Sequence, residues 1–231
     1  MAQKSASMVL VAAAVLSFGK MSMGETPGFS ETLFKAHAAV LKPALALRAR
    51  MKGRPKIAPP PNFGMVSEGI YRGSRPKTAE NFDYLKNLGV STVIDLEYFH
   101  EDSSTLCRRY GLNCVRKPLL LFPLDDEFFD WKTFREAFRL VLSERAQGRT
   151  VYFHCKDGSD RTGALAAALM IRSAVCNVSP GSAPNSRAQD DLWARIDQTL
   201  RQYGFHKVFV ILHEKIKSWI YDPSDNRWLC R

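Results

Sequence analysis

Apolar and polar positions follow two alternating patterns from about residue 65 onward. Short apolar or β-branched runs bounded by turn residues predict strands at 69–73, 91–97, 113–121 and 150–155. Between them, apolar residues recur at helical spacing and predict helices at 79–89, 103–111, 130–148 and 164–175. Strands that alternate with helices form a parallel or mixed sheet with helices on both faces. The pattern therefore predicts an α/β domain with a central, mixed, mostly parallel sheet flanked by helices.

Capping residues mark the expected ends of these helices. Thr78 precedes the first predicted helix, and Gly89 is placed to end it. Asp130 and Gly148 stand at the two ends of the third helix in the same way. The polar and apolar pattern and the cap residues therefore indicate the same boundaries.

The C-terminal part predicts a loop at 176–191 and then two helices, the first capped by Asp190 or Asp191. We assign to the core the apolar residues at helical spacing, which are Trp193, Ile196, Leu200, Val208, Val210, Ile211, Ile216 and Ile220. The last segment, 223–231, is expected to be a loose C-terminal tail.

The first 24 residues differ from the rest of the chain. Lys4 precedes a run from Met8 to Phe18 that is apolar except for Ser17, and small residues follow. This order is similar to that of a secretory signal peptide. The run is shorter than the roughly 20 apolar residues that cross a bilayer. We expect export to a bacterial periplasm or cell envelope, or membrane association; the alternatives are an uncleaved anchor and a plain N-terminal helix of a cytoplasmic protein.

Length and composition fit one enzyme-sized domain, since 45% of the 231 residues are hydrophobic and 24% are charged. The net charge is +10, and residues 32–67 contain seven Lys or Arg and no acidic residue. This predicts a basic linker at 25–60 whose residues 35–56 contact an anionic membrane surface, or are simply solvated. No aromatic residues alternate with the charges, so nucleic acid is not an expected partner. The proline-rich stretch 58–64 marks the start of the main domain, 61–222.

The five cysteines contain no C-x-x-C pair, which disfavours zinc-ribbon and thioredoxin-type functions. Cys107 and Cys114 are close enough in sequence to form a disulfide in an exported protein, although two buried free thiols are an equal alternative. Cys155 is the cysteine with a chemical reason to stay free, and Cys230 is interpreted as incidental.

Residues 151–170 combine a buried strand, a short polar loop and an apolar helix. The strand delivers Cys155 at its carboxyl end, where sheets of this kind bind ligands. A loop that curls into a helix N-terminus directs backbone N–H groups and the positive end of the helix dipole at one point. Gly158 permits the curl, and the guanidinium of Arg161 fits two oxygens of a phosphate. We therefore predict an anion-binding loop formed by Lys156, Asp157, Gly158, Ser159, Asp160 and Arg161.

The same positive potential favours the thiolate form of Cys155. A thiolate beside a bound phosphate is placed for in-line attack and a cysteinyl-phosphate intermediate. Thr162 is placed to donate a hydrogen bond to the thiolate when it departs in the second step. His154 points to the opposite side of the strand, so we predict a structural hydrogen bond for it rather than a role as base.

The segment "HCKDGSDRTG" resembles the H-C-x5-R-[ST] signature of cysteine-based protein tyrosine and dual-specificity phosphatases. The segments 62–76 and 203–219 are similar to the entry strand and the closing helix of the compact atypical dual-specificity group. That group includes bacterial periplasmic members and plant and fungal inositol-pyrophosphate phosphatases. The resemblance covers about residues 60 to 220 and implies a tyrosine-phosphatase-like fold and a cysteine-dependent hydrolase.

The resemblance also implies an aspartic acid on a movable loop that protonates the leaving alcohol and later activates water. The loop "FPLDDEFFD" occupies the expected region, and Asp126 and Asp125 are the candidates. Asp130 is interpreted as the helix cap. This mechanism requires no metal or organic cofactor.

The loop composition indicates two substrate classes. Lys156 resembles phosphoinositide phosphatases and some bacterial tyrosine phosphatases, whereas Ser159, Asp157 and Asp160 depart from the lipid-specific pattern. We favour phosphotyrosine or dual-specificity activity on phosphorylated proteins. We expect the protein to be a monomer. The alternatives are an inositol phosphate or phosphoinositide phosphatase and an inert phosphate-binding module. A rhodanese-type sulfurtransferase, which also uses a cysteine in an anion-binding loop, is disfavoured because it does not need the R-T-G helix entry.

Overall fold

The computed structural model describes residues 57–121, 129–176, 186–206 and 209–231. Its sheet has five strands in the order β1-β2-β5-β3-β4. Only the β1–β2 pair is antiparallel among the pairings of this sheet. The predicted α/β domain with a mixed, mostly parallel sheet is confirmed. The strands are β1 (Gly64–Ser67), β2 (Ile70–Ser74), β3 (Val90–Glu97), β4 (Asn113–Leu119) and β5 (Thr150–Cys155).

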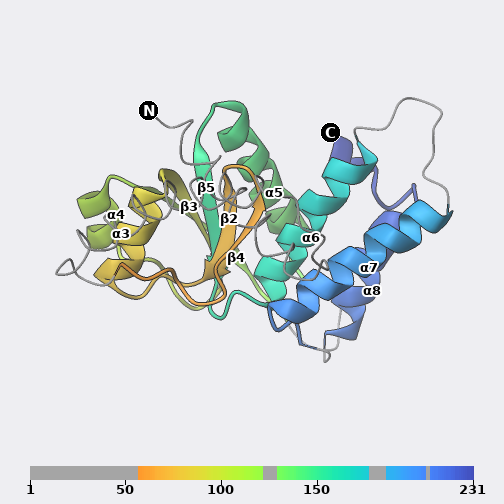
Figure 1. Ribbon diagram of the computed structural model, residues 1–231, viewed down its shortest axis with the longest axis horizontal. Helices are drawn as coiled ribbons and strands as arrows, with labels where there is room; N and C mark the ends of the chain where they lie inside the picture. Colours follow the sequence, from red (N-terminus) through yellow and green to blue (C-terminus); the bar gives the residue numbers. More distant parts are fainter. Residues whose placement is uncertain (1–56, 122–128, 177–185, 207–208) are drawn as a thin grey trace, which may run out of the picture. The chain divides into compact units, whose positions relative to one another are not determined.

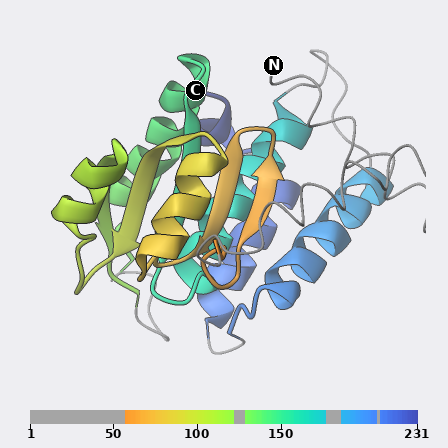
Figure 2. The same cartoon turned by 60° about the vertical axis from the view of Figure 1, so that its left-hand side comes forward.

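Helices cover both faces of this sheet. Helices α3 and α4 pack on one face, whereas α5 and α6 pack on the other and α7 and α8 pack against α6 (Figures 1 and 2). None of the helices in the described ranges is long and apolar enough to cross a bilayer. The helices are α3 (Ala79–Asn87), α4 (Ser104–Tyr110), α5 (Trp131–Ala146), α6 (Asp160–Val175), α7 (Ser186–Gln202), α8 (Val210–Tyr221) and the short 3₁₀ helix η2 (Arg227–Cys230).

The central strand β5 separates two layers of core. Val151, Phe153 and Cys155 belong to the large apolar cluster on the α5–α6 side, whereas Tyr152 belongs to the smaller cluster on the α3–α4 side. Successive side chains of a strand point to opposite faces, which explains the division. His154 therefore lies on the α3–α4 side, away from Cys155.

The predicted caps are confirmed at two helices. The hydroxyl of Thr78 accepts from the backbone N–H of Asn81, whose own side chain accepts from the N–H of Thr78, so α3 begins with a capping box. Asp130 accepts from the backbone N–H of Thr133 at 2.9 Å and caps α5. Local sequence therefore decides where these two helices begin.

The start of α7 was predicted incorrectly. The helix begins at Ser186, so Asp190 and Asp191 lie inside it, and Asp190 accepts a hydrogen bond from the Tyr221 hydroxyl at 2.7 Å. Val210 was assigned to the core and is 60% exposed. Ile196, Leu200, Ile216 and Ile220 are buried as predicted, Trp193 and Ile211 are partly buried, and Val208 lies outside the described residues.

Two disulfides join segments of the fold. One links Cys107 of α4 to Cys114 of β4. Of the two alternatives for this pair, a disulfide or two free thiols, the structure has the disulfide. The other links Cys176, at the end of α6, to Cys230. The prediction that Cys230 is incidental was therefore wrong. The tail is not loose either, because Leu229 is fully buried and its carbonyl accepts from Arg172.

Candidate active site

The candidate site lies at the carboxyl end of β5, the central strand of the sheet. The strand ends at Cys155, and residues 156–159, here called the 156–159 loop, connect it to α6. Cys155 is the only free cysteine and is 2% exposed. A single thiol thus stands between the end of a buried strand and the beginning of a helix, as predicted.

Three consecutive carbonyls of this loop are held by donors from the segment before α3. The Lys156 carbonyl accepts from the backbone N–H of Arg75 at 3.3 Å, and the Asp157 carbonyl accepts from the Asn62 side chain at 2.7 Å. The Gly158 carbonyl accepts from the guanidinium of Arg72. In a planar trans peptide the N–H points opposite to the C=O. The N–H groups of the three following residues, 157–159, therefore point to the inner side of the loop.

The curl of the loop depends on Gly158. Its φ is +72°, and a Cβ there would lie 2.5 Å from the carbonyl carbon of Gly73. The loop is therefore pressed against the end of β2. Since the inward N–H groups adjoin the N-terminus of α6, the geometry is that of an anion-binding site.

Arg161 and Thr162 lie in the first turn of α6. The Arg161 guanidinium donates to the carbonyls of Leu119 at 3.3 Å and Leu96 at 3.5 Å, so it extends over the carboxyl ends of β4 and β3. Thr162 is fully buried, and its hydroxyl has no partner among the described residues. The structure brings both residues to the same end of the sheet as Cys155, and their catalytic roles stay predictions.

The acidic residues around the loop differ in their contacts. Asp157 is exposed. Asp160 accepts from the backbone N–H of His206 at 2.8 Å, and its other oxygen lies 2.8 Å from the ring Nδ1 of the same residue. Ser159 is buried, and its hydroxyl donates to the Asp160 carboxylate at 3.3 Å. Asp160 therefore belongs to a contact between α6 and the segment after α7, and Asp157 alone places an exposed carboxylate on the loop.

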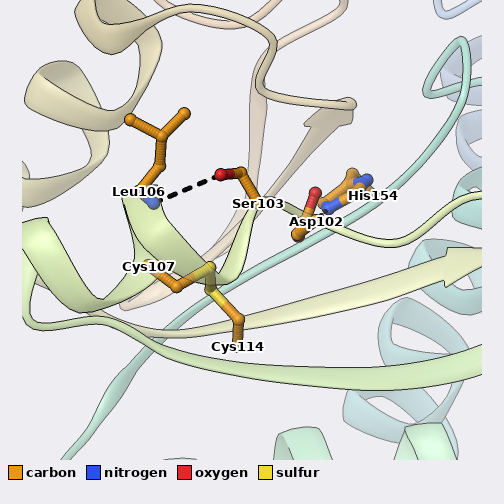
Figure 3. Close-up of a disulfide and its surroundings, with 6 residues drawn as sticks. All are labelled: Asp102, Ser103, Leu106, Cys107, Cys114 and His154. Carbon is orange, nitrogen blue, oxygen red and sulfur yellow. Dashed lines mark hydrogen bonds and ion pairs between the residues drawn. A yellow bond between two sulfur atoms is a disulfide. The ribbon is translucent and has the colours of Figure 1, made fainter.

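His154 has the structural hydrogen bond that was predicted. Its Nε2 lies 2.9 Å from a carboxylate oxygen of Asp102. Asp102 directly precedes Ser103, whose hydroxyl caps α4 by accepting from the backbone N–H of Leu106 (Figure 3). Asp95 lies 3.8 Å from the other ring nitrogen. Burial opposes the imidazolium, but the hydrogen bond and charge of Asp102, together with Asp95, outweigh it and raise the pKa of His154. The histidine is a fixed support for the strand that carries Cys155.

Asp125 and Asp126, the predicted general acids, lie outside the described residues. Asp130 caps α5, as stated above. Asp125 and Asp126 belong to the segment between β4 and α5, and the last carbonyl of β4, that of Leu119, accepts from Arg161. The chain on either side of this loop is thus placed, and the choice between the two carboxylates stays a prediction.

Sequence reasoning missed Arg72 and Asp102. Arg72 is 1% exposed in β2, where it was regarded as one residue of an apolar strand. A charged residue two positions after Ile70, on the core-facing side of that strand, was the available signal. Asp102 offered no such signal, because its partner His154 is 52 positions away.

Comparison with known proteins gives consistent matches. A sequence model described as the tyrosine phosphatase family matches residues 57–173. The chain is 32% identical over 129 residues to inositol diphosphatase DSP3 of Arabidopsis thaliana, and 29% identical over 122 residues to inositol diphosphatase DSP2 of Oryza sativa subsp. japonica. These matches cover 52% and 49% of this chain, and 59% and 55% of those relatives.

The fold is similar to that of a solved phosphatase. The core catalytic domain of the PP-IP phosphatase SIW14 from S. cerevisiae, in complex with citrate, superposes with a TM-score of 0.53 and 22% identity. The superposition covers 74% of this chain and 96% of that one. At this identity the likeness confirms the fold, whereas the family model matches the stretch that carries Cys155, Arg161 and Thr162. The chain belongs to the tyrosine phosphatase family.

Proposed function

We propose that this protein is a cysteine-dependent phosphatase that hydrolyses phosphate monoesters through a cysteinyl-phosphate intermediate. One observation carries the proposal: the carbonyls of residues 156–158 are held outward, so three N–H groups point inward beside Cys155. Backbone donors that are fixed in advance stabilise the charge of a transferring phosphoryl group without reorganising.

In the first step, the Cys155 thiolate attacks phosphorus in line with the leaving oxygen. An S–P bond forms and the P–O bond breaks, and Asp126 or Asp125 donates a proton to the leaving alkoxide or phenoxide. The Arg161 guanidinium binds two of the remaining phosphoryl oxygens. This requires Arg161 to exchange its hydrogen bonds to Leu96 and Leu119 for bonds to phosphate.

In the second step, the same carboxylate takes a proton from water, and the water oxygen attacks phosphorus. The S–P bond breaks, and inorganic phosphate and the thiolate are released. The buried hydroxyl of Thr162, which has no other partner in the described part of the chain, donates to the departing sulfur.

We propose phosphotyrosine or mixed phosphoserine, phosphothreonine and phosphotyrosine residues of proteins as the substrate class. The exposed carboxylate of Asp157 on the loop supports this choice, because it repels a substrate with many anionic groups more than one with a single phosphate. Lys156 is exposed beside it and partly offsets the repulsion.

A second candidate is an inositol phosphate, inositol diphosphate or phosphoinositide. The names of the two plant relatives favour it. Neither relative is covered over two thirds of its length, so the argument concerns the shared catalytic segment. The basic stretch 35–56 would add affinity for such a polyanion or for an anionic membrane surface.

We further propose that the protein is exported. The two disulfides support an oxidising compartment, and the apolar run from Met8 to Phe18 supplies a secretion signal.

The test is turnover by the full chain and by Cys155→Ser on phosphotyrosine peptides, phosphothreonine peptides, soluble phosphoinositides and an inositol diphosphate, in a chelator. We expect the substitution to lower kcat by about three orders of magnitude or more while orthovanadate binding persists. Reductant should be mild, because the two disulfides must stay intact.

The alternatives have distinct results. A preference for inositol substrates would replace the protein-phosphatase assignment with the second candidate. Orthovanadate binding without turnover on any substrate would indicate an inert phosphate-binding module. Sulfur transfer from thiosulfate would indicate a sulfurtransferase.

A further inference from the structure

We propose that Arg72 is a positioning residue of this site, which braces the 156–159 loop from β2 and supplies a buried positive charge on the face of the sheet that carries Cys155. The inference rests on the proposed phosphatase function and extends the site to a strand outside the H-C-x5-R-T segment. Its test includes a measurement on the free enzyme that does not depend on turnover.

The pairing of β2 with β5 places Arg72 on the side of the sheet that carries Cys155. Arg72 pairs with Phe153, and Ser74 pairs with Cys155, in a parallel register. Paired residues of neighbouring strands project to the same face. Arg72 and Cys155 therefore both point to the face that α6 covers.

The guanidinium of Arg72 is fixed between the loop and an aromatic ring. One of its nitrogens donates to the Gly158 carbonyl, and its central carbon lies 4.2 Å from the centre of the Tyr203 ring. Tyr203 packs closely on β1, because a Cβ at Gly64 would lie 2.0 Å from its hydroxyl oxygen. Tyr203, from the turn after α7, thus holds Arg72 against the loop.

The charge of Arg72 has no carboxylate partner within ion-pair distance in the described residues. Its Nε and Nη1 atoms are buried and have no hydrogen-bond partner there. A buried guanidinium in this condition is costly unless an anion compensates it. Burial lowers the pKa of Arg72 to about 10, and the charge of Cys155 is the largest influence that opposes this. Since Arg72 and Cys155 lie on the same face of neighbouring strands, we assign this buried positive charge to the anions of the site, the Cys155 thiolate and the phosphate that it attacks.

Bracing of the Gly158 carbonyl also sets the direction of the next amide. While Arg72 holds this carbonyl outward, the N–H of Ser159 points to the inner side of the loop. Without that hydrogen bond, the peptide between Gly158 and Ser159 is free to rotate, because Gly158 accepts many backbone conformations. Rotation would turn a carbonyl oxygen toward the phosphate, where it repels the ligand.

The experiment measures iodoacetamide alkylation of Cys155 against pH, in the disulfide-bonded full chain, for wild type, Arg72→Met and Arg72→Lys. The other four cysteines are in disulfides, so alkylation reports Cys155. We expect Arg72→Met to move the midpoint of the profile up by about one pH unit, and Arg72→Lys to move it less because the charge remains. Orthovanadate affinity should fall at least about tenfold in Arg72→Met.

Arg172→Met is the matched control, since Arg172 also donates to a backbone carbonyl, that of Leu229, at the opposite end of α6. Its alkylation profile and orthovanadate affinity should equal those of wild type. A folded Arg72→Met protein with both wild-type properties would overturn the proposal. If Arg72→Met does not fold, Tyr203→Leu, which uncovers the guanidinium, must move both quantities in the same direction or the proposal fails. If the wild type turns over none of the substrates, the proposed function is rejected. The alkylation profiles and orthovanadate affinities of the variants would still test the role of Arg72.

Discussion

At the scale of single residues, two glycines with the same backbone conformation have different surroundings. Gly158 has a φ of +72°, and a Cβ there would lie 2.5 Å from β2. Gly148, after α5, has a φ of +74°, and a Cβ there would have no heavy atom within 4 Å. An alanine at Gly148 therefore carries only the cost of the conformation, whereas an alanine at Gly158 also displaces the loop.

We expect Gly148→Ala to lower the free energy of unfolding by about 1–2 kcal/mol, the cost of a left-handed backbone, without changing kcat/KM. Gly158→Ala should lower the free energy of unfolding further and reduce kcat/KM at least about tenfold, because the inward N–H groups move. Urea denaturation and steady-state kinetics of the two variants measure these effects. Equal losses of stability and of kcat/KM in the two variants would mean that the contact of Gly158 with β2 does not hold the loop in place.

The pair of His154 and Asp102 predicts a pH-dependent contribution to stability. The pKa of His154 is raised in the folded protein, so the charged pair stabilises it fully below the unfolded value of about 6.5. This contribution is lost as pH rises through the folded pKa. Asp102→Asn should therefore lower the free energy of unfolding by about 2 kcal/mol near pH 6 and by less near pH 9, where an amide oxygen can still accept from a neutral ring. Thermal unfolding of wild type and Asp102→Asn at the two pH values measures this difference. An equal loss of stability at both pH values would contradict the charged pair.

Single residues were predictable from the sequence where their chemistry is local. Cys155, Arg161 and Thr162 follow from one strand, one loop and one helix turn that are continuous in the chain. Arg72 and Asp102 act through contacts 86 and 52 positions away, which only the pairing of β2 with β5 and the placement of α4 create. No local pattern contains that information.

At the scale of elements, each disulfide joins a helix to a different part of the fold. The Cys107–Cys114 bond ties α4 to β4, close to Asp102 at the start of α4 (Figure 3). The Cys176–Cys230 bond ties the end of α6 to η2. Their sequence separations are 7 and 54. A crosslink restricts the unfolded chain more when the loop that it closes is longer.

Paired alanine variants should therefore lose unequal amounts of stability. We expect removal of the long-range bond, in Cys176→Ala with Cys230→Ala, to lower the free energy of unfolding by about 4 kcal/mol. The corresponding change at Cys107 and Cys114 should lower it by about 2.5 kcal/mol. Chemical denaturation of both double variants, compared with the oxidised wild type, measures the difference. Equal losses in the two double variants would contradict the expected dependence on the length of the closed loop.

Elements were predictable where apolar spacing and caps coincide. Helices α3 and α5 show both signals, whereas strands β2 to β5 and helices α4 and α6 were predicted from apolar spacing alone. Strand β1, Gly64–Ser67, was not among the predicted strands. The first turns of α7 are polar, and its buried residues Leu192, Ile196 and Leu200 begin only six positions after Ser186, so the start of the helix was placed too late. The segment η2 is four residues long and is held by Cys230 and the buried Leu229, which are tertiary contacts.

At the scale of the whole molecule, the thiol chemistry of the chain is divided. Four cysteines form disulfides at the edges of the fold, whereas the proposed nucleophile is a free, almost fully buried thiol at its centre. An oxidising compartment stabilises the first group, whereas Cys155 has no second free cysteine in the chain with which to form a disulfide. The proposed export of the protein and the state of its cysteines are therefore one question.

We expect the full chain, expressed in a bacterium with an intact secretion pathway, to be recovered outside the cytoplasm with one titratable thiol per denatured molecule, that of Cys155. Deletion of residues 1–24 should retain the protein in the reducing cytoplasm, where the same titration finds all five thiols. Recovery of the full chain in the cytoplasm would contradict export, whereas five thiols in the exported protein would contradict the disulfides. The Cys155→Ser variant is the control, because its exported form should have no titratable thiol.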